Sequence, residues 1–385
     1  MPAPSPLEGI RVLDLTQIVA GPLCGRVLAD LGASVVKVES PTGDLARAVP
    51  PLVDGIGALY AHMNAGKRSA CVDIRADGGA ELVARLAERS DVLLENFRPA
   101  ALTGRGLGYE QLRARNPRLV YCSISGFGQD GPWADRRGHA PRLHAEGGTI
   151  EVAARLRHTA PVPEVQQHAD VYSGFVAVGA VCAALYQRER TGEGQHLDIA
   201  IAEALVYASD QAAIDLLRYD GPREFDSWTY PIVSLPSGEA VCLFGNPRRL
   251  FDAWMAALGG GDGEGAPADE DEAAARVRRA AEARFSSAEE LQEALEAAGV
   301  GSGVVQPVTA LAESEWALAR GLLVEGAVGV RVPAAPWRSS GATIGTTRQA
   351  ARLGAQTREV LSELGIAAAD LDRLEADGVI RCAAT

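Results

Sequence analysis

Residues 10–40, IRVLDLTQIVAGPLCGRVLADLGASVVKVES, decide the fold class of this chain. The apolar run at 10–16 predicts a short buried strand, and the segment 23–32 predicts a helix that ends at Gly32. A second apolar run at 34–40 predicts another strand. A strand, a helix and a strand in this order form a βαβ unit, whose two strands lie parallel in one sheet. The opening segment therefore predicts an α/β protein.

The same alternation continues along the chain. Further strands are expected at SACVDI (69–74), DVLLEN (91–96) and RLVYCSISGFG (118–128). Helices are expected between them at GGAELVARLAERS (78–90) and YEQLRARN (109–116). Repeated βα units of this kind build a parallel, doubly wound, Rossmann-like sheet.

Ligands of doubly wound sheets bind at the carboxyl ends of the strands. We therefore expect one crevice surrounded by the loops that begin at Gln17, Ser40, Asn96 and Gly126. The first of these loops lies in TQIVAGPLCG (16–25), which lacks the G-x-G-x-x-G spacing of dinucleotide-binding loops. An ordinary strand-to-helix turn explains that loop equally well, so the spacing alone does not identify a ligand.

Composition excludes several classes of function. A chain of 385 residues with 47% hydrophobic content can bury a large core, and we expect two domains. The net charge of −13 disfavours nucleic acid as a partner. The most apolar stretch, 173–186, is shorter than the roughly 18 residues of a membrane span, so we interpret it as a buried helix. Six scattered cysteines without a secretory leader favour the cytoplasm. The acidic, glycine-rich residues 259–270 are expected to form an exposed loop.

Two residues are candidate catalytic residues. His139 lies in DRRGHAPRLHAEGG (135–148), a stretch rich in arginine and histidine, and Asp170 precedes an apolar helix. Taken alone, Asp170 is most simply a helix N-cap, and His139 is either a working acid or base or a solvated loop residue. No metal is expected, because a helical or strand spacing with acidic residues is lacking for His144, His158 and His168.

Several long motifs together resemble one known family. They are LEGIRVLDLTQIVAGPLCGRVLADLGASVVKVESPTGDLAR (7–47), NAGKRSACVDI (64–74), DVLLENFRP (91–99), SISGFGQDGPWADRRGH (123–139), ALYQRERTGEGQHLDIAIAEA (184–204) and TREVLSELG (357–365). Their order and spacing are similar to those of the family III CoA-transferases (CaiB/BaiF-like), a group that also contains α-methylacyl-CoA racemase. Long motifs in one order are far more specific than a single short pattern.

The resemblance implies an architecture for the whole chain. A Rossmann-like large domain would occupy residues 1–225, a smaller α+β domain residues 226–325, and a C-terminal segment, 326–385, would return to the large domain. The family also implies a homodimer whose two chains are interlocked, which buries a large interface.

The resemblance further implies a coenzyme A site. The implied contacts are Gln17, Ile18, Val19 and Ala20 for the adenosine part, Val72, Asn96 and Phe97 along the same channel, and Arg137 for phosphate. Relatives carry arginine at two positions where this chain has Ser40 and Gly104. Phosphate binding is therefore expected to be weaker here or to use Arg98, Arg105 and Arg47.

In the transferases of this family, the aspartate that matches Asp170 is the nucleophile. The resemblance implies that its carboxylate attacks the thioester of an acyl-CoA, forms a mixed anhydride and then an aspartyl-CoA thioester, from which a carboxylic acid takes the CoA. The start of a helix is expected to keep this carboxylate ionised.

The resemblance leaves two alternatives open. In the racemases, a histidine that matches His139 and the aspartate that matches Asp170 exchange the α-proton of the acyl group, and the separation of 31 residues fits that pattern. This chain departs from the racemases at Ala140 and at Asn246, where they carry aspartate and a supporting glutamate. It also lacks the glycine-rich loop of formyl-CoA transferase, which counts against the transferase. We nevertheless place the transferase ahead of the racemase, because His139 can also orient the acyl carbonyl as a hydrogen-bond donor without any proton transfer. A CoA- or acyl-carrier-binding protein without turnover is the third interpretation.

Overall fold

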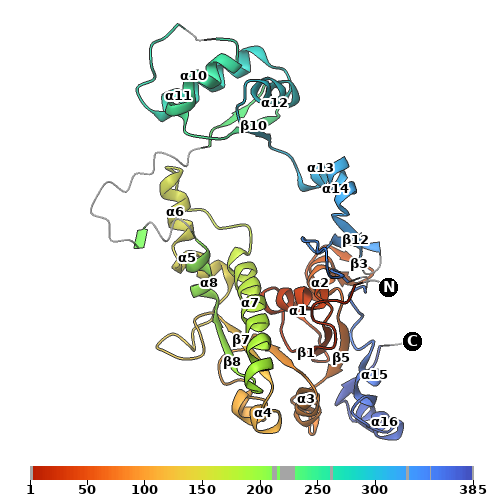
Figure 1. The fold of residues 1–385 in the computed structure, drawn as a ribbon. Helices are drawn as coiled ribbons and strands as arrows, with labels where there is room; N and C mark the ends of the chain where they lie inside the picture. The colour runs from red at the N-terminus through yellow and green to blue at the C-terminus, as the bar shows by residue number, and fades with distance from the viewer. Residues whose placement is uncertain are drawn as a thin grey trace. The chain divides into compact units, whose positions relative to one another are not determined.

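In the computed structural model, the chain forms two compact units (Figure 1). Unit 1 consists of residues 1–149, 163–213 and 316–385, and unit 2 consists of residues 150–162 and 214–315. The structure describes residues 3–209, 215–216, 230–260, 263–326, 329–346 and 348–383. The domain boundary predicted at residue 225 lies outside the described residues, and the predicted three-part division stays a prediction.

A seven-stranded sheet forms the centre of unit 1, in the order β14-β5-β2-β1-β6-β7-β8. Its strands are β1 (Arg11–Asp14), β2 (Ser34–Glu39), β5 (Arg68–Val72), β6 (Val92–Glu95), β7 (Val120–Ser125), β8 (His196–Ala200) and β14 (Ile380–Arg381). All neighbouring strands from β5 to β8 pair in parallel, and β14 adds an antiparallel edge to β5. Without β14, this is the strand order of a doubly wound Rossmann sheet, whose direction of winding reverses between β1 and β6. The predicted fold class is confirmed.

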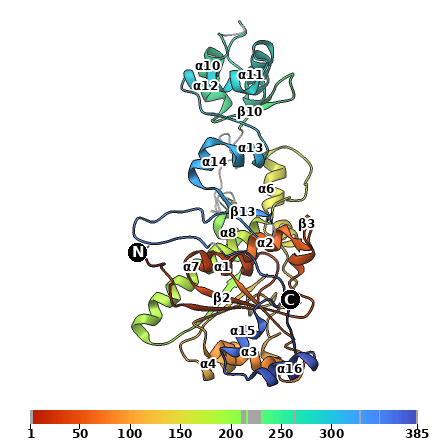
Figure 2. The ribbon, with the colours of Figure 1, turned by 90° about the vertical axis from the view of Figure 1, so that its right-hand side faces the viewer.

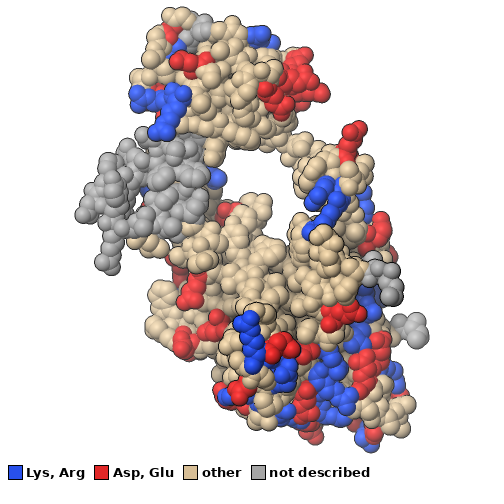
Figure 3. All heavy atoms as spheres, in the orientation of Figure 1, with Lys and Arg blue, Asp and Glu red and all other residues tan. Residues whose placement is uncertain are grey.

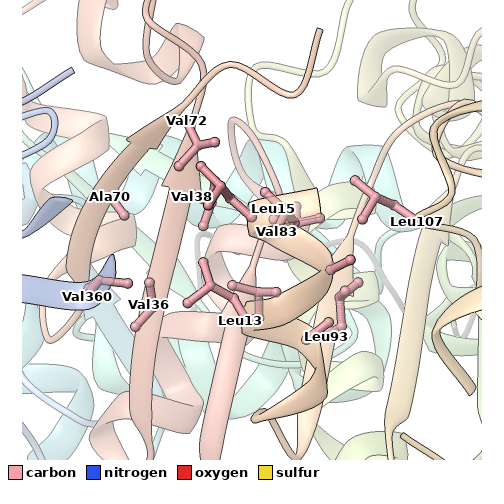
Figure 4. Packing of buried hydrophobic residues seen from close by; sticks show 14 of the residues in the cluster. Leu13, Leu15, Val36, Val38, Ala70, Val72, Val83, Leu93, Leu107 and Val360 are labelled. Carbon is pink, nitrogen blue, oxygen red and sulfur yellow. The ribbon is translucent and has the colours of Figure 1, made fainter. Parts of the chain in front are cut away.

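Helices cover both faces of this sheet (Figure 2). One face packs against α1 (Ala20–Asp30) and α7 (His168–Thr191), and the other against α3 (Gly79–Glu88), α4 (Tyr109–Arg115) and α15 (Thr357–Ser362). Successive strand residues alternate between the two cores because side chains on a strand point to opposite faces. Figure 4 shows Leu13, Val36 and Leu93 from the sheet meeting Val83 of α3 and Val360 of α15.

The predicted elements of the first 128 residues agree with the observed ones to within a few residues. Several short elements of unit 1 were not predicted. These are η1 (Leu45–Ala48), β3 (Leu52–Val53), β4 (Ile56–Gly57), α2 (Ala58–Asn64), η2 (Thr103–Arg105), α5 (Ala140–Glu146), α8 (Ile201–Ala208), β12 (Leu323–Glu325), β13 (Arg331–Pro333), α16 (Ala368–Ala376) and the edge strand β14. Most span too few residues to show a period of hydrophobic positions.

Unit 2 has its own α+β core. An antiparallel sheet in the order β11-β10-β9 packs against helices through Val241, Trp254, Val277 and Leu291, all fully buried. Its elements are α6 (Thr149–Leu156), whose first residue belongs to unit 1, β9 (Ile232–Ser234), β10 (Ala240–Leu243), α10 (Pro247–Ala257), α11 (Glu270–Arg284), α12 (Ala288–Ala297), β11 (Ser302–Val304) and α13 (Val308–Glu313). The next helix, α14 (Glu315–Arg320), begins at the last residue of unit 2 and otherwise lies in unit 1. In the predicted acidic loop, residues 259–260 and 263–269 form no helix or strand and are mostly exposed.

Helix α7 contains the apolar stretch that the sequence places in a buried helix. Within the described residues, it is the one helix long and apolar enough to cross a membrane, judged by length and composition alone. It packs against α1, β7 and β8, and 39% of its most apolar window is buried. The core helix of a globular protein passes the same criterion. Its first turn carries Asp170, which gives this helix a place in the candidate site.

Charged side chains of unit 1 pair locally. Arg115 contacts Glu81 at 2.6 Å between α4 and α3, and Arg358 of α15 contacts Asp372 of α16 at 2.7 Å. On the face drawn in Figure 3, basic and acidic side chains accordingly alternate over the region of these helices. A face with this mixture of charges differs from the continuous basic surface that phosphate backbones require.

Candidate active site

A cavity of about 420 Å³ lies in unit 1 at the carboxyl ends of β1, β6 and β7. This is the place where the winding of the sheet reverses, and where doubly wound proteins bind their ligands. The cavity is lined by Gln17, Ile18, Val19, Ala20, Leu45, Asn96, Phe97, Arg98, Pro99, Ile124, Ser125, Gly126, Ala134, Arg136, Arg137, Gly138, His139, Asp170 and Ile201. Apolar walls with a few charged groups suit a ligand that has both apolar and anionic parts.

Ten of the twelve predicted site residues line this one cavity: Gln17, Ile18, Val19, Ala20, Asn96, Phe97, Arg98, Arg137, His139 and Asp170. Val72 lines a smaller neighbouring cavity of about 90 Å³, which shares Gln17 and Phe97 with the first. Arg105 lines neither cavity. Its guanidinium donates to the carbonyl oxygen of Ile74 at 3.3 Å, at the border of the smaller cavity. The roles of all twelve residues stay predictions.

Asp170 occupies the third position of α7 and does not cap it. The N-cap position belongs to Gln167, whose side chain makes no capping hydrogen bond, while the backbone N–H of Ala169 donates to Nε2 of His144 at 3.4 Å. Within the described residues, no hydrogen bond or ion pair reaches the Asp170 carboxylate. The interpretation of Asp170 as a simple cap therefore differs from the structure, and its carboxylate lines the cavity instead.

Burial controls the ionisation of this carboxylate. The start of a helix was expected to favour the charged form. Loss of hydration has the larger effect, because it raises the pKa of Asp170 from 3.8 to about 6. At pH 7, about nine in ten such groups are still ionised. A carboxylate that is ionised yet poorly hydrated is a better nucleophile than one in water.

His139 reaches the cavity through a close contact between two glycines. A Cβ atom added to Gly138 would lie 2.1 Å from the Cα of Gly126, and one added to Gly126 would lie 2.4 Å from the Cα of Gly138. Only glycine at both positions lets the segment that carries Arg137 and His139 rest on the end of β7. His139 is exposed and occupies the N-cap position of α5.

Asn96 holds the first loop of the cavity. Its side-chain oxygen accepts a hydrogen bond from the backbone N–H of Gln17 at 2.8 Å, and its amide nitrogen donates to the backbone oxygen of Gln17 at 2.8 Å. The two hydrogen bonds join the ends of β1 and β6. The next residue, Ile18, has a φ of 72°. A β-branched residue rarely adopts this left-handed conformation.

Two arginines at the cavity have no acidic partner in the described part of the chain. They are Arg98 and Arg137, both exposed. Arg136 differs, since it pairs with Glu146 at 3.1 Å. Arg47, considered as a phosphate ligand, donates to both oxygens of Glu39 at 2.7 Å and is thereby held in the fold. Arg98 and Arg137 are consequently the cations available to an anionic ligand here.

Among the side chains that line the cavity, Leu45, Ser125 and Arg136 were not predicted from the sequence. Leu45 lies in the loop that was expected to begin at Ser40 but was not itself predicted, and Arg136 was not singled out beside Arg137. Ser125 ends β7, a position that the strand-end rule singles out. Its hydroxyl is buried and has no hydrogen-bond partner. Among the described residues, no group of three or more His, Cys, Asp or Glu side chains is placed to hold a metal ion.

The chain is similar in sequence to proteins of known function. The sequence matches the profile of CoA-transferase family III over residues 7–357. It is 43% identical over 206 residues to the succinate–glutarate CoA-transferase of Agrobacterium fabrum, covering 51% of each protein. It is 41% identical over 201 residues to the formyl-CoA:oxalate CoA-transferase of Streptomyces avermitilis, covering 52% of this chain and 49% of that protein. The chain thus spans about half the length of the curated relatives it matches.

A solved structure extends the likeness to nearly the whole chain. A CaiB/BaiF family protein from Brucella suis matches with a TM-score of 0.82 and 32% identity. The match covers 94% of this chain and 100% of that one. The likeness therefore includes residues beyond the half that aligns with the curated relatives.

Proposed function

Because the chain belongs to CoA-transferase family III, we propose that it moves CoA from an acyl-CoA to a carboxylic acid, with Asp170 as the nucleophile. The observation that carries the proposal is the Asp170 carboxylate, which lacks a protein partner in the described chain and lines the cavity at the reversal point of the sheet. The names of the relatives, which transfer CoA between carboxylic acids, support the same reaction.

The reaction runs through two exchanges at one carboxylate. An oxygen of Asp170 attacks the thioester carbonyl of the donor, the carbon–sulfur bond breaks, and the CoA thiolate leaves behind a mixed anhydride. The thiolate then attacks the aspartyl carbonyl, releases the donor acid and forms an aspartyl-CoA thioester. The acceptor carboxylate attacks this thioester, and the thiolate finally attacks the acceptor's carbonyl, which frees Asp170 again. No proton needs to be removed from carbon.

Other lining residues have supporting roles in this proposal. Ile18, Val19 and Phe97 supply apolar contacts for the adenosine and pantetheine parts of CoA, while Arg98 and Arg137 face its phosphates. His139 donates a hydrogen bond to the acyl oxygen and so polarises the carbonyl under attack. The interlocked homodimer and the cytoplasmic location remain predictions.

Covalent trapping tests the proposal. The chain is incubated with succinyl-CoA, glutaryl-CoA and a panel of branched and aromatic acyl-CoAs, treated with borohydride or hydroxylamine, and weighed by intact-protein mass spectrometry. Borohydride should convert Asp170 to homoserine, and hydroxylamine should convert it to the hydroxamate. Asp170→Asn should prevent both changes, whereas the control Asp135→Asn, an exposed aspartate outside the cavity lining, should not. Absence of an adduct with every acyl-CoA would contradict the proposal.

One observation favours racemase activity as a second candidate function: His139 and Asp170 line the same cavity. Asn246, which stands where racemases support their histidine, caps α10 within unit 2 by accepting from the backbone of Arg248 and Arg249. A racemase would exchange the α-proton of a 2-methylacyl-CoA with deuterated solvent and would lose this exchange in His139→Ala. A transferase should show no exchange, and binding without adduct or exchange would indicate the third interpretation, a protein without turnover.

A further inference from the structure

The loop that enters the cavity after β1 contains a strained residue. Ile18 has a φ of 72°, and its side chain is β-branched, so its Cβ crowds the backbone in this conformation. Such a conformation persists only where the surroundings hold it in place. Ile18 lines the cavity, and the question is which group prevents it from relaxing.

The carboxylate of Asp44 makes the contact that holds Ile18. One of its oxygens accepts hydrogen bonds from the backbone N–H of Ile18 at 3.0 Å and from that of Ala46 at 2.9 Å. The bond to Ala46 caps the 3-10 helix η1, whose first residue is Leu45. Ile18 and Leu45 line the same cavity, so a single carboxylate fixes two of its apolar walls.

A buried lysine holds the Asp44 carboxylate in turn. The second oxygen of Asp44 lies 3.0 Å from Lys37 Nζ, and both side chains are inaccessible to solvent. The same ammonium donates to the backbone oxygen of Thr16 at 2.7 Å. Burial lowers the pKa of Lys37, but the carboxylates around it, Asp14 and Asp44 first, raise it overall, so the ammonium stays charged. Lys37 therefore links Asp44 to Thr16, which belongs to the same loop after β1 as Ile18.

We propose that Asp44 is a positioning residue of the cavity, which acts by keeping Ile18 in its left-handed conformation. Without this carboxylate, Ile18 relaxes to a negative φ, and the wall formed by Ile18 and Leu45 moves. Only the identity of the ligand, coenzyme A, rests on the proposed function. The conformational part rests on the hydrogen bonds and the φ of Ile18.

A double-mutant cycle tests whether Asp44 acts through Ile18. Binding of free coenzyme A is measured by titration calorimetry for the full chain, D44A, I18G and the double variant. D44A should weaken binding about tenfold or more, the scale expected when a strained conformation is lost. In chains that carry I18G the same change should weaken binding less than about threefold, because glycine adopts a positive φ without a steric cost. Equal factors in both backgrounds would overturn the proposal.

The control removes a helix cap elsewhere. Asp269 of unit 2 caps α11 by accepting from the backbone N–H of Glu272 at 2.8 Å, and it lines neither cavity. D269A should leave coenzyme A binding unchanged, which separates the positioning of Ile18 from the loss of any cap. Should D44A fail to fold, Asp44→Ser runs the same cycle, since serine retains a capping oxygen for η1.

Amide hydrogen exchange distinguishes failure of this proposal from failure of the proposed function. The Ile18 amide should be protected in the unliganded chain and should exchange at least about tenfold faster in D44A. If the unaltered chain binds no coenzyme A, the proposed function fails, and exchange at Ile18 still decides the role of Asp44. Unchanged exchange at Ile18 in D44A would refute it.

Discussion

Replacing Asp170 with asparagine should make the protein more stable at neutral pH while removing its proposed nucleophile. The pKa of this carboxyl rises from 3.8 to about 6 on folding because burial removes its hydration. A difference of about two units corresponds to about 3 kcal/mol, at 1.36 kcal/mol for each unit. Asparagine carries no charge to desolvate, so Asp170→Asn should raise the free energy of unfolding by up to about 3 kcal/mol at pH 7.

The pH dependence of this difference identifies its cause. Because the folded-state pKa lies above the value in the unfolded chain, the contribution of Asp170 to stability is present below pH 4 and is lost as the pH rises through 6. The wild-type protein and Asp170→Asn should therefore differ by less than about 1 kcal/mol near pH 4 and by the full amount at pH 7 to 8.

Urea unfolding followed by circular dichroism at several pH values measures this difference. The control is Asp135→Asn, which removes an exposed carboxylate outside the cavity lining and should change stability little at any pH. An Asp170→Asn protein that is equally or less stable at pH 7, or a difference that does not vary with pH, would refute the argument that burial raises the pKa of Asp170.

Three further outcomes are expected. The kcat/KM of CoA transfer should fall about tenfold for each pH unit below about 6, because protonation of Asp170 removes the nucleophile; a flat profile between pH 5 and 7 would contradict this role. Gly138→Ala should lower both activity and melting temperature, since its Cβ would lie 2.1 Å from a backbone atom, whereas Gly104→Ala, with open space around it, should change neither. Lys67→Met should destabilise the fold by about 3–5 kcal/mol in urea unfolding, because it removes the ammonium that lies 2.7 Å from the buried carboxylate of Asp14 and leaves that charge without a cation in direct contact.

Much of the large unit could be predicted from local sequence patterns. The apolar strands of the βαβ units are continuous because both of their faces are buried, which makes them visible without long-range information. The edge strand β14 was missed because it has two residues and forms only by pairing with β5. Propensity and periodicity carry no signal over so short a segment.

The candidate site was predictable where topology alone determines position. Gln17 and Asn96 follow β1 and β6, and the carboxyl ends of these neighbouring strands must lie together. The role of Asp44 was not predictable, since the hydrogen bond to Ile18 joins residues 26 positions apart. The contact between Gly126 and Gly138 was not predictable either, because it depends on the path of the loop between them.

The proposed function requires the carboxylate of Asp170 to carry CoA during transfer. In the proposed reaction, the acceptor acid attacks the aspartyl-CoA carbonyl, and its attacking oxygen stays on Asp170 when the thiolate takes the acyl group. Turnover with an acceptor acid labelled with ¹⁸O, followed by mass spectrometry of the peptide that contains position 170, therefore tests this requirement directly. Heavy oxygen should appear in the Asp170 side chain. Unlabelled Asp170 after many turnovers would contradict it.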